Sequence, residues 1–365
     1  MDLSLTPEQV GLSETLQRLL ADLYPAAVLS TDEEPRAADR LWAELTGSGW
    51  LGVGVPEELG GSGGGAIELA IIFRHLGRAV APSRYRSAVL ARLLVRALAR
   101  DDQLSEILPV LSAGQQTATV AYAEDGAEND PDHMATVAKH DGAGWRLSGA
   151  KALVPDASSA DFLIVAARAQ YDGALAFIRA NRAAPGLSIT DRQIFSRDPY
   201  SDVVLSDVPA DSAARLGSGD STATYLRYRD SATALTAMEM VGSLERVHEI
   251  MIGHVTSRTQ FGVPVGSFQA VQHHAADVAI ALAGARLAAW KAVVSHDQGR
   301  PSAIAKAAAG RALRNATVLA HQVCGGMGYT TESPLHRYSE RAMTYEILLG
   351  GWDYQLERVA VSLGL

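Results

Sequence analysis

Four long stretches with a helical pattern, joined by short connections, constrain the fold of this chain more than any other feature. Each is strongly apolar and longer than the average helix of a globular protein, so each must bury a wide face against its neighbours. Four such helices in series predict an antiparallel four-helix bundle. The stretches run over about 222–255, 268–297, 302–323 and 335–363.

The first third of the chain is also predicted to be helical. Thr6 precedes Pro7 and stands three residues before Gln9, which is the spacing of a capping box, so a helix should begin here and run to about Leu23. A glycine-rich stretch over 51–65 lacks the Lys-Ser/Thr of a phosphate-binding P-loop and is interpreted as a structural turn. Further helices are expected over about 36–45, 66–79, 86–99 and 102–112.

The pattern changes near Thr117. From there to about Leu216, short alternating apolar runs are interrupted by Gly, Asp, Pro and Asn, which is typical of a small antiparallel β-domain. The predicted fold class is therefore α+β, because helical and strand segments are separated along the chain. We expect an N-terminal helical domain at 1–116, a middle β-domain at 117–218 and a C-terminal four-helix bundle at 219–365.

Composition narrows the possible functions. A single cysteine, Cys324, excludes an internal disulfide framework and fits a reducing compartment. The net charge of −9, without a basic cluster, argues against nucleic acid as the main partner. The chain has no uncharged apolar run of about 18 residues and no secretory signal at its beginning. We therefore expect a cytoplasmic protein with neither a nucleic-acid nor a membrane partner.

The segment 257–279 carries the clearest sign of a ligand. Arg258, Phe261 and the pair Phe268-Gln269 place a guanidinium and an amide among aromatic rings, just before a helix. Such a group suits a ligand with phosphates at one end and a flat heterocycle at the other. The alternative is an ordinary helix start with an exposed arginine and a packed phenylalanine.

Segments along the whole chain resemble the acyl-CoA dehydrogenase family, and they occur in the family's order. The resemblance implies that family's fold, FAD as the cofactor, a CoA thioester as the substrate, and a flavin site that spans two subunits. The segments are the PEELGGSGG turn at 56–64, GAK and ASSADFLIVAAR within 149–168, RTQFG and FQ within 258–269, and HQVCGGMGYTTESPLHRYSERA at 321–342.

The resemblance also implies which residues bind the cofactor. Arg258 would pair with the pyrophosphate of FAD, and Phe261 would pack near its adenosine. Gly325 and Gly326 would let a phosphate or ribose of the other subunit's cofactor approach the backbone. Taken alone, the two glycines are equally typical of an ordinary helix end. The implied cofactor-binding residues are Arg258, Phe261, Phe268, Gln269, Gln322, Gly325 and Gly326.

The side of the site that would hold the flavin ring departs from the family's pattern. Typical members have a T-E-x-x-x-G-S-D segment and a K-x-W-I-T segment, whereas this chain has YAEDGAEND at 122–130 and KALVPDA at 151–157. Leu153 stands at the tryptophan position and cannot stack like an indole. Pro155 stands at the threonine position and has no N–H to donate. The ring side is therefore expected to be degraded.

The catalytic base is the second departure. The family removes a proton alpha to the thioester carbonyl with a glutamate. Its usual position is Leu349 in this chain, and its alternative position is Ala232. Neither side chain can take a proton. Glu346 lies three residues before Leu349 and could share its helix face, so it is a weak substitute.

Other reactive groups carry weaker hypotheses. Asp230 and Glu239 are further candidate bases, although a structural role is simpler for each. His273, His274 and Asp277 do not make a convincing metal site, because two ligands on one helix face lack a third. No metal is expected. Cys324 lies at an apolar helix end, which favours packing over nucleophilic catalysis.

Three interpretations follow. In the first, the chain is a subunit of a two-gene α2β2 acyl-CoA dehydrogenase that desaturates a CoA thioester, as in actinobacterial steroid degradation and lipid metabolism. It would lack its own glutamate and work with a homologous catalytic chain, with an electron-transferring flavoprotein as a candidate electron acceptor. In the second, it is a self-sufficient, diverged oxidoreductase of secondary metabolism that uses a different base, alone or as a homo-oligomer. In the third, it is a binding or scaffold protein without flavin.

Overall fold

The computed structural model describes residues 4–125 and 131–365 and divides into two compact units. The bundle unit contains the described residues up to Leu41 together with Ala66–Ala81 and Asp230–Leu365. The sheet unit contains Trp42–Gly65 and Pro82–Arg229. Each unit takes in part of the N-terminal helical region, and the three domain boundaries expected from the sequence stay a prediction.

The N-terminal region is helical, as predicted. The capping box forms at its first helix, where Thr6 Oγ1 accepts the N–H of Gln9 at 3.3 Å and Gln9 Oε1 accepts the N–H of Thr6 at 3.0 Å. The glycine-rich stretch over 51–65 is a loop with short 3-10 turns, also as predicted. The helices are α1 (Pro7–Leu23), α2 (Glu34–Gly47), α3 (Ala66–Ala79), α4 (Arg84–Leu98) and α5 (Asp101–Ser112).

The sheet unit is built around one sheet with the strand order β1-β4-β2-β3-β7-β6, in which β5 pairs with β4. The other strand pairs of this sheet are antiparallel, as predicted, but β1 and β2 each pair with β4 in parallel, which corrects the prediction in that respect. Alternating apolar residues fix which face of a strand is buried but not the direction of its neighbour. The strands are β1 (Ala118–Ala121), β2 (Val137–His140), β3 (Gly144–Pro155), β4 (Phe162–Ala169), β5 (Leu175–Asn181), β6 (Leu187–Arg192) and β7 (Tyr200–Asp211).

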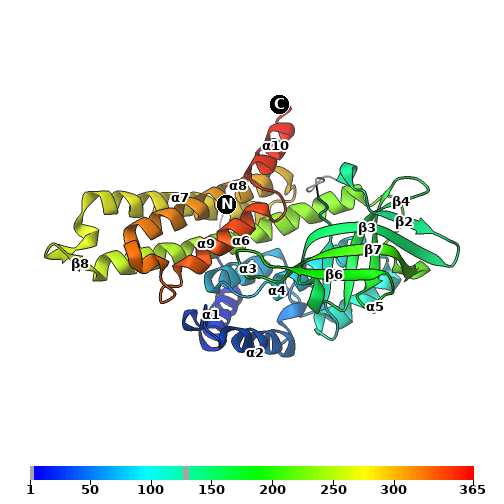
Figure 1. Ribbon diagram of the computed structural model, residues 1–365, viewed down its shortest axis with the longest axis horizontal. Helices are drawn as coiled ribbons and strands as arrows, with labels where there is room; N and C mark the ends of the chain where they lie inside the picture. The colour runs from blue at the N-terminus through cyan, green and yellow to red at the C-terminus, as the bar shows by residue number, and fades with distance from the viewer. Residues whose placement is uncertain (1–3, 126–130) are drawn as a thin grey trace. The chain divides into compact units, whose positions relative to one another are not determined.

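The bundle unit is made of long helices, and α7 and α8 lie side by side within it (Figure 1). The predicted last helix over 335–363 is broken into two, which both pack on α8. The break falls at Leu349 and Gly350, whose φ angles of 58° and 90° are incompatible with a continuing helix. The helices are α6 (Thr222–Ser257), α7 (Gln269–Val294), α8 (Gly299–Cys324), α9 (Leu335–Ile347) and α10 (Trp352–Ser362), and the strands β8 (Thr259–Gln260) and β9 (Val263–Pro264) form a hairpin before α7.

Within the described ranges, we find no helix that combines the length and the apolar character needed to cross a bilayer. The longest helix, α6, buries apolar side chains such as Leu244, Val247 and Met251 inside the protein. The apolar composition of α6 is therefore explained by packing within the protein.

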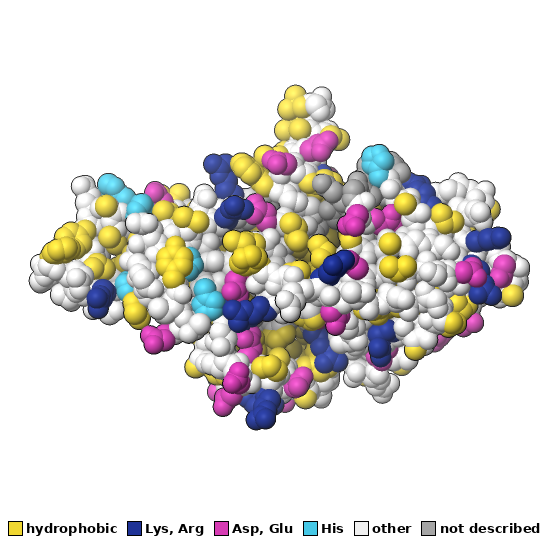
Figure 2. Space-filling model, viewed as in Figure 1, with side chains coloured by type: hydrophobic (Ala, Val, Ile, Leu, Met, Phe, Trp, Pro, Cys, Tyr) yellow, Lys and Arg dark blue, Asp and Glu magenta, His cyan; other side chains and the backbone are white. Residues whose placement is uncertain are grey.

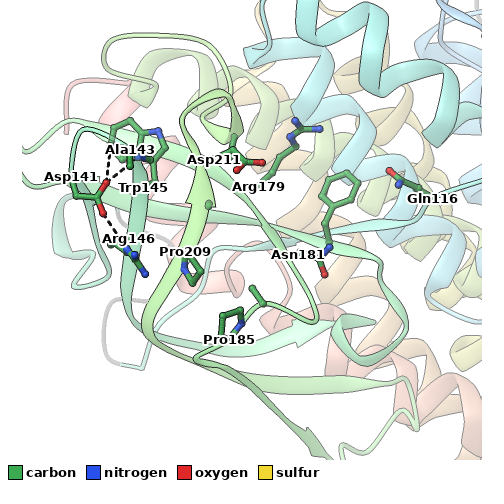
Figure 3. Close-up of a pocket in the computed structure, with 15 residues that line it drawn as sticks. Gln116, Asp141, Ala143, Trp145, Arg146, Arg179, Asn181, Pro185, Pro209 and Asp211 are labelled. Atoms are coloured by element: carbon green, nitrogen blue, oxygen red, sulfur yellow. Dashed lines mark hydrogen bonds and ion pairs between the residues drawn. The ribbon is translucent and has the colours of Figure 1, made fainter.

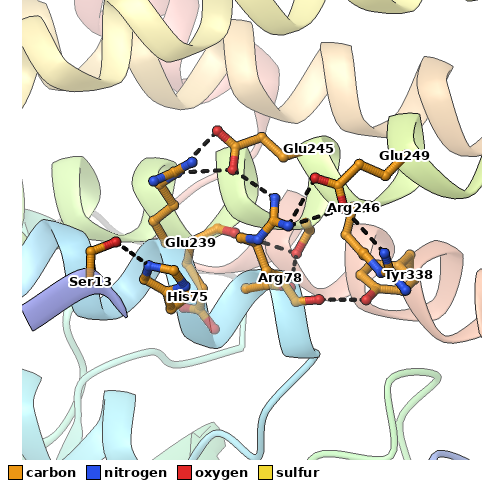
Figure 4. A network of polar contacts seen from close by, with 11 residues as sticks. Ser13, His75, Arg78, Glu239, Glu245, Arg246, Glu249 and Tyr338 are labelled. Carbon is orange, nitrogen blue, oxygen red and sulfur yellow. Dashed lines mark hydrogen bonds and ion pairs between the residues drawn. The ribbon is translucent and has the colours of Figure 1, made fainter. Parts of the chain in front are cut away.

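Ion pairs join α3 to α6 inside the bundle unit (Figure 4). Glu245 accepts two hydrogen bonds from Nε of Arg74, at 2.9 and 3.0 Å, and one from Arg78 at 3.2 Å. Arg78 also donates to Glu249 at 2.9 and 3.0 Å. The hydroxyl of Tyr338 on α9 donates to the backbone oxygen of Arg78 at 2.5 Å. These bonds fix the register of three helices that are distant in sequence.

Glycines allow α3 and α6 to approach closely. A Cβ on Gly77 would lie 1.8 Å from the backbone oxygen of Glu239, and one on Gly242 would lie 1.8 Å from that of Arg74. Both distances are far below van der Waals contact, so neither position accepts a side chain without separation of the helices.

We therefore expect Gly242→Ala to lower the free energy of unfolding by about 1–3 kcal/mol, because overpacking forces backbone shifts. Gly253→Ala on the same helix is the matched control, since a Cβ there meets nothing within 4 Å. It should stabilise the protein by up to about 1 kcal/mol through helix propensity. Urea denaturation followed by circular dichroism measures both, and equal stability of the two variants would contradict the close helix contact.

Candidate functional site

Arg258 lies in the connection that follows α6. Its N–H donates to the backbone oxygen of His254 at 2.9 Å, and its own backbone oxygen accepts the N–H of Val265 at 2.8 Å. Its backbone is thus fixed at the base of the β8–β9 hairpin, while its side chain is exposed. Because these hydrogen bonds involve only the backbone of Arg258, its guanidinium stays available for a ligand or a partner.

Two aromatic rings stand at the same hairpin. Phe261 at its tip has a φ of 53° and is 91% exposed, and Phe268 lies edge-to-face against it with ring centroids 6.1 Å apart. Figure 2 shows hydrophobic side chains gathered at the end of the bundle unit where Figure 1 places β8. An aromatic residue such as Phe261, exposed and in a strained backbone conformation, indicates a contact surface and not a core position.

The remaining predicted cofactor residues lie at the ends of α7 and α8. Gln269 is the first residue of α7, and Gln322 is in the last turn of α8. Gly325 has a φ of 58°, and neither it nor Gly326 has anything within 4 Å of the place a Cβ would take. Because α7 and α8 are antiparallel and joined by the short connection 295–298, these residues lie at the same end of the pair (Figure 1).

This end of the bundle unit suits a dinucleotide. It offers one guanidinium, two amides, two glycine backbones without side-chain cover and two aromatic rings, which match phosphate, ribose and adenine in turn. All seven predicted cofactor residues are exposed in this chain. The structure brings them to one end of the bundle, although a glycine helix end would also explain Gly325.

The sheet unit carries the segment that would meet a flavin ring, and its hydrogen-bonding groups are used internally. The register of β3 against β7 shifts between Lys151 and Val154, so a bulge forms at Leu153. Leu153 has a φ of 49°, and its N–H donates to Asp202 Oδ1 at 3.1 Å. Pro155 has no N–H, and its oxygen accepts from Thr119 Oγ1 at 2.6 Å. The bulge presents a leucine side chain and no free donor at these two positions.

A buried ion pair lies behind this bulge. Lys151 Nζ donates to Glu124 Oε1 at 2.6 Å, and Glu124 also accepts the N–H groups of Ala135 and Thr136 at 2.6 and 3.0 Å. Burial lowers the pKa of Lys151 to about 8. Burial alone would raise the pKa of Glu124, but the hydrogen bonds from Lys151 and Thr136 hold it below its ordinary value. Residues 126–130 of the predicted YAEDGAEND segment lie outside the described residues.

Asp156, which follows Pro155, is a buried acid next to the ring-side segment that sequence reasoning missed. It is buried, has a φ of 54° and accepts hydrogen bonds from Ser83 Oγ at 2.9 Å and Ser87 Oγ at 2.5 Å. Burial and the nearby Asp198 raise its pKa from 3.8 to about 6, against the hydrogen bonds of the serines. Its only sequence signal is an acid within an apolar run, which does not reveal burial.

The raised pKa of Asp156 predicts a pH dependence of stability. The folded state binds a proton that the unfolded state has lost between pH 3.8 and about 6, so stability should fall as the pH rises through that window. The effect is at most about 3 kcal/mol. We expect Asp156→Asn to flatten the slope and the exposed control Asp22→Asn to leave it unchanged. Thermal unfolding at pH 4, 5, 6 and 7 measures this, and identical slopes in all three proteins would refute it.

The two positions of the family's base hold no acid. Ala232 is fully buried in α6, and Leu349 lies in the turn between α9 and α10. Lys306 and Gln355, both buried, hold this turn. Lys306 Nζ donates to the backbone oxygens of Tyr345 and Gly350 at 2.7 and 3.1 Å, and Gln355 Nε2 donates to that of Leu349 at 2.6 Å. Burial lowers the pKa of Lys306 to about 7. The turn is rigidly built around an apolar residue.

The substitute carboxylates are engaged in ion pairs. Glu346 pairs with Arg314, and Asp230 pairs with Arg358. Glu239 is 1% exposed and lies 3.8 Å from Arg341. These pairs give each acid a structural role that does not require catalysis. Glu346 also borders a cavity of about 340 Å³ together with Lys306, Trp352 and Gln355.

The described residues hold no group of three histidine, cysteine or acidic side chains arranged for a metal. His273, His274 and Asp277 are accordingly not joined by a further ligand there. Cys324 is 7% exposed, and burial raises the pKa of its thiol, which favours packing over nucleophilic attack.

A second cavity, of about 520 Å³, opens in the sheet unit (Figure 3). Trp145 lines it together with Arg146 and Arg179, whose charges are already paired with Asp141 and Glu106 at 3.2 Å each. None of the predicted cofactor or base residues lines this cavity. It is therefore separate from the candidate site.

Known proteins show the same organisation. The N-terminal and C-terminal domain models of acyl-CoA dehydrogenases match residues 6–115 and 231–364. Acyl-CoA dehydrogenase FadE27 of Mycobacterium tuberculosis is 32% identical, with 90% of this chain and 89% of the relative covered. A solved variant of the Tcur3481-Tcur3483 steroid ACAD is 31% identical, with a TM-score of 0.87 and 98% of both chains covered.

The ChsE4-ChsE5 complex from Mycobacterium tuberculosis contains a chain that is 27% identical, with a TM-score of 0.89, covering 100% of this chain and 99% of its own. The matched models account for most of the sequence, and the fold agrees over its whole length. The chain therefore belongs to the acyl-CoA dehydrogenase family of flavin-dependent oxidoreductases, whose cofactor is FAD.

Proposed function

We propose that this chain is a subunit of a heteromeric acyl-CoA dehydrogenase and that it lacks a catalytic glutamate of its own. The observation that carries the proposal is the apolar character of both base positions, Leu349 and Ala232, while Glu346, Asp230 and Glu239 are held in ion pairs. A homologous chain that bears the glutamate would supply the base.

Two similar structures support a heteromer and a substrate class. One is named as a steroid ACAD with two components, and the other is named as a complex of two proteins. We accordingly propose a CoA thioester of a steroid or another lipid as the substrate, and α,β-desaturation as the reaction. An electron-transferring flavoprotein would take up the electrons, in the cytoplasm.

The main role of this chain would be to bind the nucleotide part of FAD. We call the residues that would do so the nucleotide grip: Arg258, Gln269, Gln322, Gly325 and Gly326. When bound, FAD accepts the hydride from the β-carbon of the thioester. Arg258 would neutralise the pyrophosphate, while Gln269 and Gln322 would donate to the ribose and phosphate oxygens. Gly325 and Gly326 would let these groups approach the backbone.

The surface of the bundle unit fits an assembly of this kind. Ile280 and Leu287 of α7 are 72% and 59% exposed, and Val318 of α8 is 62% exposed. Such side chains on neighbouring helices favour a protein–protein contact. The predicted nucleotide grip lies at one end of the same two helices, so a partner that covers them would meet the grip.

Co-expression tests the proposal. Purified alone, the chain should be colourless or poorly soluble, and with a homologous glutamate-bearing chain it should give a complex that contains FAD. Replacing the partner's glutamate by glutamine should abolish turnover of an acyl-CoA, whereas Glu346→Gln in this chain should leave it unchanged. A chain that is yellow and active alone would contradict the proposal.

One observation favours a second candidate, a self-sufficient diverged enzyme. Glu346 precedes the turn that carries Leu349 and borders the 340 Å³ cavity, so an acid is present near the usual base position. This alternative predicts a homo-oligomer that contains FAD and turns over its substrate without a partner. In that case Glu346→Gln should stop turnover, which separates the two functions.

A further inference from the structure

A buried histidine lies directly beside the glycines that we assign to FAD. His321 is 7% exposed and stands in the last turn of α8, one residue before Gln322. Its backbone oxygen accepts the N–H of Gly325, the residue that follows the end of α8. The resemblance implies that Gln322, Gly325 and Gly326 in this segment bind the cofactor, and it gives His321 no role.

The imidazole joins the glycine turn to a neighbouring helix. Its Nε2 lies 2.7 Å from Ser339 Oγ on α9. Its ring stacks on that of Tyr329, with centroids 4.4 Å apart and an interplanar angle of 25°. Gly328 packs against its other nitrogen, because a Cβ there would lie 3.2 Å from Nδ1. One side chain therefore contacts α9 and the far end of the turn over Gly325–Tyr329.

The beginning of this turn has no such support. Gly325 and Gly326 are exposed, and nothing lies within 4 Å of the place where either Cβ would be. Glycine backbones have more freedom than those of other residues, and a ligand that binds them must remove that freedom. A buried ring that fixes the end of the turn removes part of it before the ligand arrives.

We propose that His321 is a positioning residue, which holds the Gly325–Gly326 backbone ready for the pyrophosphate and ribose of FAD. The inference rests on the proposed function, since it needs the glycine turn to bind the cofactor. Burial and the nearby His336 lower the pKa of His321, so the neutral ring is favoured. A neutral imidazole can share a hydrogen bond with the Ser339 hydroxyl without placing a charge in the interior.

The test measures the dissociation constant of FAD in the complex with the glutamate-bearing chain. His321→Leu keeps a buried side chain but removes both nitrogens, and it should weaken FAD binding about tenfold, as expected for one lost hydrogen bond. His321→Asn retains a polar group and should recover most of the affinity. His296→Leu, in the exposed connection between α7 and α8, is the matched control and should bind FAD normally.

Ser339→Ala keeps the test informative if His321→Leu misfolds, because it removes the partner hydroxyl with little change in volume. It should also weaken FAD binding, with the complex intact by gel filtration. Normal FAD binding in both His321→Leu and Ser339→Ala overturns the positioning role. Arg258→Ala separates failure of the positioning role of His321 from failure of the proposed nucleotide grip. If it releases FAD while His321→Leu does not, only the positioning role fails, and if neither releases FAD, the proposed nucleotide grip fails as well.

Discussion

A complex that carries Arg258→Ala should bind FAD about 10- to 100-fold more weakly than the unmodified complex, because a charge-assisted hydrogen bond contributes about 1.5–3 kcal/mol. In the free chain the guanidinium is exposed, and the backbone of Arg258 is fixed by His254 and Val265. The substitution therefore removes a ligand contact without removing an internal one. Fluorescence of FAD released during dialysis measures the loss.

Two controls sharpen this prediction. Arg40→Ala, at an exposed position of α2, changes the net charge equally and should leave FAD bound. Arg258→Lys keeps the charge but loses the bidentate geometry, so it should give an intermediate affinity. If Arg258→Ala retained FAD as tightly as Arg40→Ala, the arginine would have no role in gripping the nucleotide.

The second large effect should come from Lys151→Met, which we expect to lower the free energy of unfolding by about 3–5 kcal/mol. The side chain of Lys151 is 0% exposed and that of Glu124 is 7% exposed, at 2.6 Å from each other. Removing the ammonium leaves a buried carboxylate without its counter-charge. Urea denaturation followed by tryptophan fluorescence measures the change, since Trp145 lies in the same strand as Lys151.

A second substitution identifies the cause. Lys151→Met combined with Glu124→Gln removes both charges and should regain a substantial part of the lost stability, because an uncharged pair has no buried charge to desolvate. Lys139→Met on β2 is exposed and should change stability by less than about 0.5 kcal/mol. A double variant no more stable than Lys151→Met alone would show that the loss comes from packing.

Local patterns predicted the helices well because their causes are local. The spacing of Thr6 and Gln9 predicted the capping box that begins α1, and the hydrogen bonds of that box are present. Apolar periodicity located α6, α7 and α8 within a few residues of their ends. It could not see the break at Leu349, where a leucine takes a left-handed conformation that lysine and glutamine side chains hold from other helices.

The candidate site also has residues that the sequence could identify and contacts that it could not. Arg258 and Gln269 could be named from sequence, since they follow the family's motif, and the structure places both at one end of the α7–α8 pair. The contacts of Asp156 and His321 could not be, because they join residues on different elements. Their roles in binding and catalysis stay predictions that the experiments above address.

The sequence by itself determined the order of helices and strands, the family, and the absence of an acid at Leu349 and Ala232. Only the tertiary structure decided that β1 and β2 run parallel to β4, that Lys151 and Glu124 form a buried pair, and that the surviving nucleotide residues are exposed together. The physical reason is the separation along the sequence of the groups that interact. Helix periods and caps are set by residues within one or two turns, whereas strand direction, burial and ion pairing depend on groups that meet only when the chain has folded.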